Sequence, residues 1–156
     1  EGTLYAVEHG PLGGDELNVV EGGGNYGWPD FSYGLNYDRT PVSGMTEEEA
    51  EAVSILPLAY WSPAFRVAPS GLHRIEGATD PAWDGSFLVG ALYRHDLLRY
   101  DPLTDETEVV RARVGRVRDI ARLPRGDFLI AVDAGSPSAS LTGRIIRLSP
   151  DASTPR

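Results

Sequence analysis

Two arginines, Arg116 and Arg118, are the residues of this chain best suited to bind a charged ligand. Residues 111–125 hold six of the 14 basic residues, although the formal net charge of the chain is −9. Side chains two residues apart on a β-strand point to the same face, and each planar guanidinium group can grip a carboxylate through two hydrogen bonds. The spacing predicts a site for a specific anion, with Asp119 holding one guanidinium in place. The alternative is a strand of alternating charge with a solvated face.

A second candidate is the glycine-rich loop at residues 9–16, which has the sequence His-Gly-Pro-Leu-Gly-Gly-Asp-Glu. Ca²⁺ binds six to eight oxygen atoms, and main-chain carbonyls and carboxylates both serve as ligands. Glycine keeps the carbonyl oxygens of such a loop accessible. An ordinary connection between two strands would share this composition, so both interpretations stay open.

An aromatic segment follows at residues 25–29, Asn-Tyr-Gly-Trp-Pro, with Tyr33 and Tyr37 after it. These rings could form a wall for a flat ligand or a sugar, or they could pin a loop by packing. Neither interpretation is favoured by the sequence. For Tyr60 and Trp61, packing is expected.

Composition excludes several other functions. The acidic balance argues against general binding to nucleic acid, and no apolar run approaches the ~20 residues of a membrane span. The chain contains neither Cys nor Lys, which excludes disulfides, thiolate metal sites and Schiff-base chemistry. It lacks a starting Met and opens in a strand-like run, so we expect it to be a piece of a longer protein.

The elements that would position these residues form a repeat. Three segments alike in sequence are each followed by a polar connection and a second apolar strand, and two are preceded by a further strand. The second and third segments start 41 positions apart, within the ~40–50-residue period of propeller blades. We therefore expect an all-β chain, about three blades of four-stranded antiparallel sheets, truncated at both ends. The similar segments are residues 2–7, 85–90 and 126–131, and their partners are residues 15–20, 96–100 and 143–148.

The stretch from about residue 22 to residue 69 interrupts this period and is expected to be a long irregular insertion in a single domain spanning residues 1–156. Within it, Thr46 and Glu49 have the spacing of a capping box and predict the start of a short helix. Long irregular insertions on a repeat scaffold often carry function.

Taken together, five motifs in this order resemble the PQQ-dependent sugar dehydrogenases, the glucose/sorbosone dehydrogenase family, and within it the soluble aldose sugar dehydrogenases. The resemblance implies a six-bladed β-propeller of which this chain would be the C-terminal half. It also implies a periplasmic or secreted location. The motifs are at residues 8–18, 24–29 with 32–37, 68–71, 83–92 and 115–119.

The resemblance also implies roles for individual residues, with PQQ and Ca²⁺ as cofactors. The main-chain carbonyls of Gly10 and Pro11 match the positions that hold the cofactor's Ca²⁺, and Glu16 and Tyr26 match further calcium-ligand positions. In the same way, Tyr37 matches a cofactor contact.

In the second half of the chain, Arg116 and Arg118 match the pair that binds the PQQ carboxylates. The family usually has a lysine in contact with the cofactor where this chain has Tyr93, followed by Arg94. These two residues are therefore candidate cofactor contacts.

The implied reaction is oxidation of the C1 hydroxyl of an aldose to a lactone, with an external electron acceptor. The family's general base is a histidine in the N-terminal half, and none of the three histidines here matches it. The fragment alone is therefore expected to be inactive. The alternative, favoured by Tyr93 in place of lysine, is a non-catalytic propeller that binds ligands through a decayed cofactor site.

Overall fold

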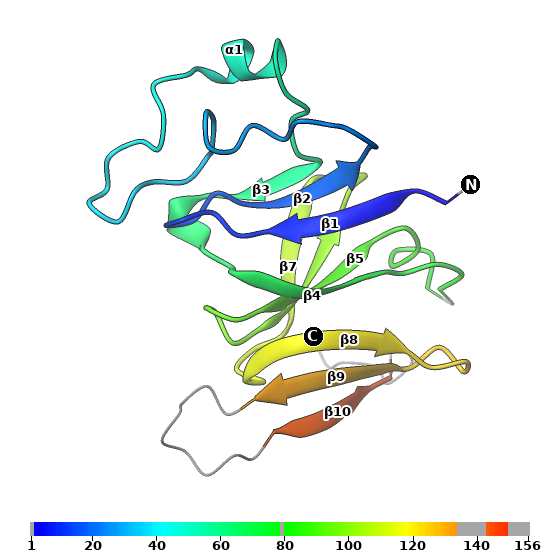
Figure 1. Ribbon diagram of the computed structural model, residues 1–156. Helices are drawn as coiled ribbons and strands as arrows, with labels where there is room; N and C mark the ends of the chain where they lie inside the picture. The colour runs from blue at the N-terminus through cyan, green and yellow to red at the C-terminus, as the bar shows by residue number, and fades with distance from the viewer. Residues whose placement is uncertain (1, 79, 134–142, 150–156) are drawn as a thin grey trace. The chain divides into compact units, whose positions relative to one another are not determined.

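A computed structural model describes residues 2–78, 80–133 and 143–149 (Figure 1). The chain divides into two compact units, Glu1–Pro69 and Ser70–Arg156. Nearly all regular structure in the described residues is β, as the sequence predicts. The strands are β1 (Leu4–Glu8), β2 (Asp15–Val20), β3 (Ala59–Trp61), β4 (Pro69–Arg74), β5 (Phe87–Ala91), β6 (Leu97–Asp101), β7 (Glu106–Arg111), β8 (Arg116–Arg122), β9 (Phe128–Asp133) and β10 (Arg144–Leu148).

The first unit contains an antiparallel sheet in the order β1-β2-β3. Its central strand, β2, pairs Glu16 with Glu8 on β1 and with Tyr60 on β3. Leu17 and Asn18 follow each other on β2 and are both fully buried. Because neighbouring residues of a strand point to opposite faces, the sheet is covered on both faces at β2. Leu17 is buried on one face and Asn18 on the other.

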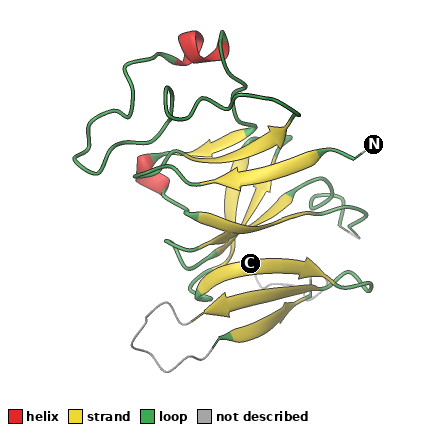
Figure 2. Cartoon of the chain, in the orientation of Figure 1, coloured by secondary structure: helices red, strands yellow, loops and turns green. Residues whose placement is uncertain are grey.

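The long connection between β2 and β3 is mostly irregular, with α1 (Glu47–Glu51) as its helix (Figure 2). The predicted capping box is confirmed. The Thr46 side chain accepts a hydrogen bond from the Glu49 backbone N–H at 3.2 Å, and the Thr46 N–H donates to the Glu49 carboxylate at 2.8 Å. These two bonds satisfy helix-end groups that would otherwise need water. The connection ends at β3, which the sequence did not predict.

The second unit contains two antiparallel sheets, one in the order β4-β5-β6-β7 and one in the order β10-β9-β8. Its core is formed by apolar side chains of both sheets. The largest fully buried ones include Leu88 on β5, Leu97 on β6, and Phe128 and Ile130 on β9. The repeat predicted from the sequence is therefore present as sheets of three, four and three strands among the described residues.

Close packing against β8 explains two glycines. A Cβ atom on Gly71 would lie 2.8 Å from the Cα of Asp119, and one on Gly90 would lie 2.4 Å from a methyl group of Val117. The Ser70 hydroxyl also donates a 2.5 Å hydrogen bond to the carbonyl of Val117. Strands β4, β5 and β8 therefore approach closely, and this contact fixes the strand that carries Arg116 and Arg118.

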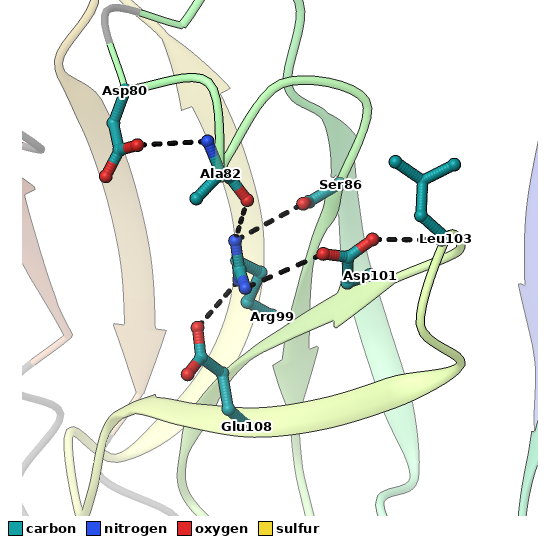
Figure 3. Close-up of polar contacts among 7 residues, drawn as sticks. All are labelled: Asp80, Ala82, Ser86, Arg99, Asp101, Leu103 and Glu108. Atoms are coloured by element: carbon teal, nitrogen blue, oxygen red, sulfur yellow. Dashed lines mark hydrogen bonds and ion pairs between the residues drawn. The ribbon is translucent and has the colours of Figure 1, made fainter.

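Arg99 on β6 organises the loop between β4 and β5 (Figure 3). Its guanidinium donates to the main-chain carbonyl of Ala82 and lies 5.3 Å from the ring centre of Trp83. The same group pairs with Glu108 at 2.7 Å and approaches Asp101 at 3.8 Å. Only 14% of the Arg99 side chain is exposed, whereas the Glu108 side chain is 57% exposed, so the guanidinium group is largely shielded from water although this partner is not.

Replacing Arg99 with methionine is expected to lower the free energy of unfolding by about 2–3 kcal/mol, because hydrogen bonds and ion pairs of a shielded charge are lost together. Arg74→Met is the matched control. Arg74 pairs with Glu76 at 2.7 Å, but the two side chains are 42% and 71% exposed, so a change below about 0.5 kcal/mol is expected. Urea denaturation measures the free energy of unfolding of both variants. Equal losses would contradict the conclusion that the contacts of Arg99 contribute more because Arg99 is less exposed.

None of the helices among the described residues has the length and apolar character needed to cross a lipid bilayer.

Candidate functional site

The candidate calcium loop of the first unit joins β1 to β2. At Gly10 and Gly14 of this loop there is no room for a side chain. A Cβ atom on Gly10 would lie 2.0 Å from the carbonyl oxygen of Gly13. Gly14 has a φ of +68°, and a Cβ atom there would lie 2.0 Å from the backbone nitrogen of Gly34. The Gly14 N–H also donates to the carbonyl of Trp61 at 2.8 Å. The loop backbone is thus held against neighbouring backbone.

Glu16 lies on β2 directly after this loop and is only 9% exposed. The Asn18 amide donates weak hydrogen bonds to Glu16 at 3.3 Å and to Glu8 at 3.4 Å. Burial raises the pKa of Glu16 from 4.5 to about 7; the hydrogen bond from Asn18 opposes this rise, and the charges of Glu8 and Asp15 add to it. A carboxylate that is costly to ionise in isolation suits a cation ligand, because the cation offsets that cost.

The two tyrosines of the first unit that are site candidates differ in their surroundings. The Tyr26 hydroxyl accepts a hydrogen bond from the Glu21 N–H at 2.5 Å and donates to the carbonyl of Val19 at 3.1 Å. This hydroxyl is therefore engaged by backbone, so the Tyr26 main-chain carbonyl is the better candidate ligand. Tyr37 is 82% exposed and presents its ring to solvent.

Three further aromatic residues of this unit, Phe31, Tyr33 and Tyr60, pack against one another, whereas Trp28 is 61% exposed. Tyr33 stacks on Tyr60 with ring centres 3.8 Å apart, and Phe31 meets Tyr33 edge-on at 4.9 Å. The Tyr33 hydroxyl donates to Glu47 at 3.0 Å, and burial, followed by this hydrogen bond, raises the pKa of Tyr33. Trp61 is 4% exposed, so the packing expected for residues 60 and 61 is confirmed.

In the second unit, Arg116 and Arg118 lie on β8 on either side of Val117, which is fully buried. Asp133 on β9 is the residue directly opposite Arg116, and its carboxylate pairs with the Arg118 Nε at 2.6 Å. Because residues directly opposite in an antiparallel pair share a face, Arg116 and Asp133 lie on one face of the sheet, and the ion pair holds the Arg118 guanidinium next to Asp133.

The prediction that Asp119 holds one of the two guanidinium groups was wrong. The Asp119 carboxylate accepts a 2.8 Å hydrogen bond from the Ile120 N–H, whereas Asp133 holds Arg118. The physical reason is a register shift in the pairing of β8 with β9 between Val117 and Asp119. A bulge of this kind re-aims the side chains that follow it.

The Arg116 Nε is buried and has no hydrogen-bond partner among the described residues. A buried donor of a charged group that lacks an acceptor is costly, and such groups are rare in folded proteins. A carboxylate ligand would satisfy it. Because of this unsatisfied donor, the pair of Arg116 and Arg118 suits a ligand that carries several carboxylates.

Tyr93 and Arg94 lie in the turn between β5 and β6. Tyr93 is 57% exposed. The Arg94 Nε pairs at 3.2 Å with Asp96, a 6% exposed carboxylate that also accepts from the Arg113 N–H at 2.9 Å. Arg94 is therefore held within its own turn by Asp96, and a ligand that used its guanidinium would share it with that residue.

Within the part of the chain that the structure describes, no group of three or more His, Cys, Asp or Glu side chains could hold a metal ion. Any calcium ion in the first unit would therefore depend chiefly on main-chain carbonyls. The loop of Gly10 and Pro11 offers oxygens of this kind, and Glu16 offers a carboxylate.

Three comparisons agree on the relationship of this chain to known proteins. The aldose sugar dehydrogenase YliI of Escherichia coli is 31% identical over 152 residues, which cover 95% of this chain and 38% of that protein. A crystal structure of a glucose dehydrogenase, 31% identical, superposes with a TM-score of 0.75 over 95% of this chain and 41% of that one. A PQQ-bound aldose sugar dehydrogenase from Streptomyces coelicolor, 23% identical, has the same fold, with a TM-score of 0.65 over 94% of this chain and 39% of that one.

The chain spans between 34% and 38% of the length of the curated relatives it matches, in keeping with a partial propeller. The profile of the glucose/sorbosone dehydrogenase family matches residues 1–147. Because the family profile covers nearly the whole chain, and because the sheets and the five motifs agree with it, the chain belongs to the glucose/sorbosone dehydrogenase family.

Proposed function

We propose that this chain forms the cofactor-binding part of a PQQ- and calcium-dependent aldose dehydrogenase. The observation that carries the proposal is the buried Nε of Arg116, which has no hydrogen-bond partner in the described part of the chain and lies two residues from Arg118 on β8. PQQ is a planar tricarboxylate, which suits paired guanidinium groups. The PQQ-bound relative from Streptomyces coelicolor supports the choice of this ligand.

In this proposal the two units have different tasks. The carbonyls of Gly10 and Pro11 hold the cofactor's calcium ion, while Glu16 and the Tyr26 carbonyl are further calcium ligands. The guanidinium groups of Arg116 and Arg118 bind cofactor carboxylates and so fix its orientation.

Tyr37 would contact the cofactor through its exposed ring, and Tyr93 and Arg94 would line the position that a lysine occupies elsewhere in the family. When bound, PQQ supplies a hydride acceptor and Ca²⁺ supplies a Lewis acid.

In this proposal the residues of this chain bind and orient the cofactor and its calcium ion. None of its histidines is proposed to remove the proton from the C1 hydroxyl of the sugar. His9, for example, has its Nε2 2.6 Å from the carbonyl oxygen of Pro69, which engages that nitrogen. The general base would come from a part of the full-length protein outside these 156 residues. An external acceptor would reoxidise the cofactor, and a periplasmic or secreted location is part of the proposal.

Calorimetric titration of the full-length protein with PQQ tests this function. Saturable binding in Ca²⁺ that is lost in EDTA is expected, together with oxidation of an aldose in the presence of a dye acceptor. The 156-residue chain assayed alone should give no turnover, because it lacks the base. Binding without turnover in the full-length protein would favour a non-catalytic module, and no calcium-dependent binding would reject the proposal.

A further inference from the structure

Asp15, the first residue of β2, accepts three hydrogen bonds from backbone N–H groups through its carboxylate. One carboxylate oxygen accepts a hydrogen bond from the Gly10 N–H at 3.2 Å. The other accepts from the backbone N–H groups of Val67 and Ala68 at 2.9 and 3.0 Å. A single side chain therefore joins the start of the calcium loop to a segment more than fifty residues away in sequence.

This carboxylate is 2% exposed, and no cation pairs with it among the described residues. Three N–H donors stabilise the charged form of a buried carboxylate, but they carry only partial charges. The site thus retains buried negative charge five residues from Gly10 and four residues from Pro11. A divalent cation bound by those carbonyls would be attracted by that charge.

The loop cannot adjust easily if this anchor is lost. The absence of room for side chains at Gly10 and Gly14 shows that its backbone already touches other backbone. Gly13 is similar, because a Cβ atom there would lie 2.4 Å from the Cα of Pro63. The hydrogen bond from the Gly10 N–H to the Asp15 carboxylate holds the first part of the loop against β2.

We propose that Asp15 is a positioning residue for calcium: it holds the loop so that the Gly10 and Pro11 carbonyls face one ion, and its charge favours a cation there. The inference rests on the proposed function of that loop. Groups that orient metal ligands without touching the metal typically change affinity by about 10–100-fold when they are replaced.

The test is a calcium titration of the full-length Asp15→Asn protein by isothermal titration calorimetry. Asparagine keeps the size of the side chain but turns one acceptor into a donor that faces backbone N–H groups, and it removes the charge. The dissociation constant for Ca²⁺ is expected to rise about tenfold or more. Asp127→Asn is the matched control, because Asp127 is also buried, at 9% exposure, and hydrogen-bonded, to Arg147, but lies in the β8–β9 hairpin.

Both variants should lose thermal stability, and only Asp15→Asn should lose calcium affinity. Equal calcium affinity in Asp15→Asn and wild type overturns the inference and leaves the proposed function intact. A wild-type protein that binds no Ca²⁺ overturns both.

If Asp15→Asn does not fold, amide hydrogen exchange of the wild-type protein tests whether Asp15 anchors the loop at Gly10. The Gly10 amide should exchange at least tenfold more slowly than that of Gly23, whose surroundings are open, and equal rates reject the anchor.

Discussion

Replacing Arg116 and Arg118 together with alanine in the full-length protein is expected to weaken PQQ binding by about 100-fold or more. Hydrogen bonds to charged groups contribute about 1.5–3 kcal/mol each when they are shielded, and 1.4 kcal/mol corresponds to a factor of ten in affinity. Arg116→Ala alone should account for the larger share, because the Arg116 Nε is buried and none of the described residues is its hydrogen-bond partner. Arg118 already has Asp133 at 2.6 Å. Calorimetry in Ca²⁺ measures each constant.

Arg111 and Arg113, which belong to the same basic stretch, provide the control. The contact of Arg113 with Asp96 is made by its backbone N–H, so alanine keeps it, and Arg111 lies at the end of β7. The double variant Arg111→Ala, Arg113→Ala should change PQQ affinity less than about threefold. A similar loss in both double variants would mean that the stretch acts through its overall charge rather than through a defined pair.

The largest effect on stability is expected from Gly14→Ala, at about 2–5 kcal/mol. A left-handed backbone conformation costs an alanine about 1–2 kcal/mol, and forcing an atom into filled space adds about 1–3 kcal/mol or more. At Gly14 the new methyl group would lie 2.0 Å from the Gly34 nitrogen, which is backbone and cannot rotate away. Urea denaturation should show the loss, and calcium binding should weaken with it because the loop would move.

Gly23→Ala separates the two contributions. Gly23 has a φ of +80°, close to the +68° of Gly14, but nothing lies within 4 Å of its Cβ position. Only the conformational cost remains, so a loss of about 1–2 kcal/mol is expected. If the two variants lost equal stability, crowding against Gly34 could not be the reason that glycine is required at position 14.

Much of the sheet structure could be predicted because the signals are local. The strands with apolar alternation or continuous apolar runs, such as β5 and β9, were found within two residues of their bounds. So was the helix start at Thr46, whose cap depends on a residue three positions away. Neither β3 nor β7 was predicted. β3 has three residues, and β7 has mostly exposed side chains, so neither leaves a distinct apolar pattern.

The candidate site was predictable in its residues but less so in its contacts. The spacing of Arg116 and Arg118 identified the pair, yet the partner Asp133 became evident only from the register of β8 with β9. Asp15 was included in the loop motif as one oxygen ligand among several. Its role as an anchor depends on Val67 and Ala68, and bonds across fifty residues leave no trace in local sequence.

The ion pair of Arg118 with Asp133 has a consequence for ligand selectivity. A ligand with one carboxylate that approached Arg118 would only exchange one carboxylate for another, and would gain little. A ligand whose second carboxylate reaches Arg116 at the same time would satisfy a donor that has no partner within residues 2–78, 80–133 and 143–149. In the proposed site, Asp133 therefore competes with a ligand that has a single carboxylate, and the pair favours a rigid ligand that has several.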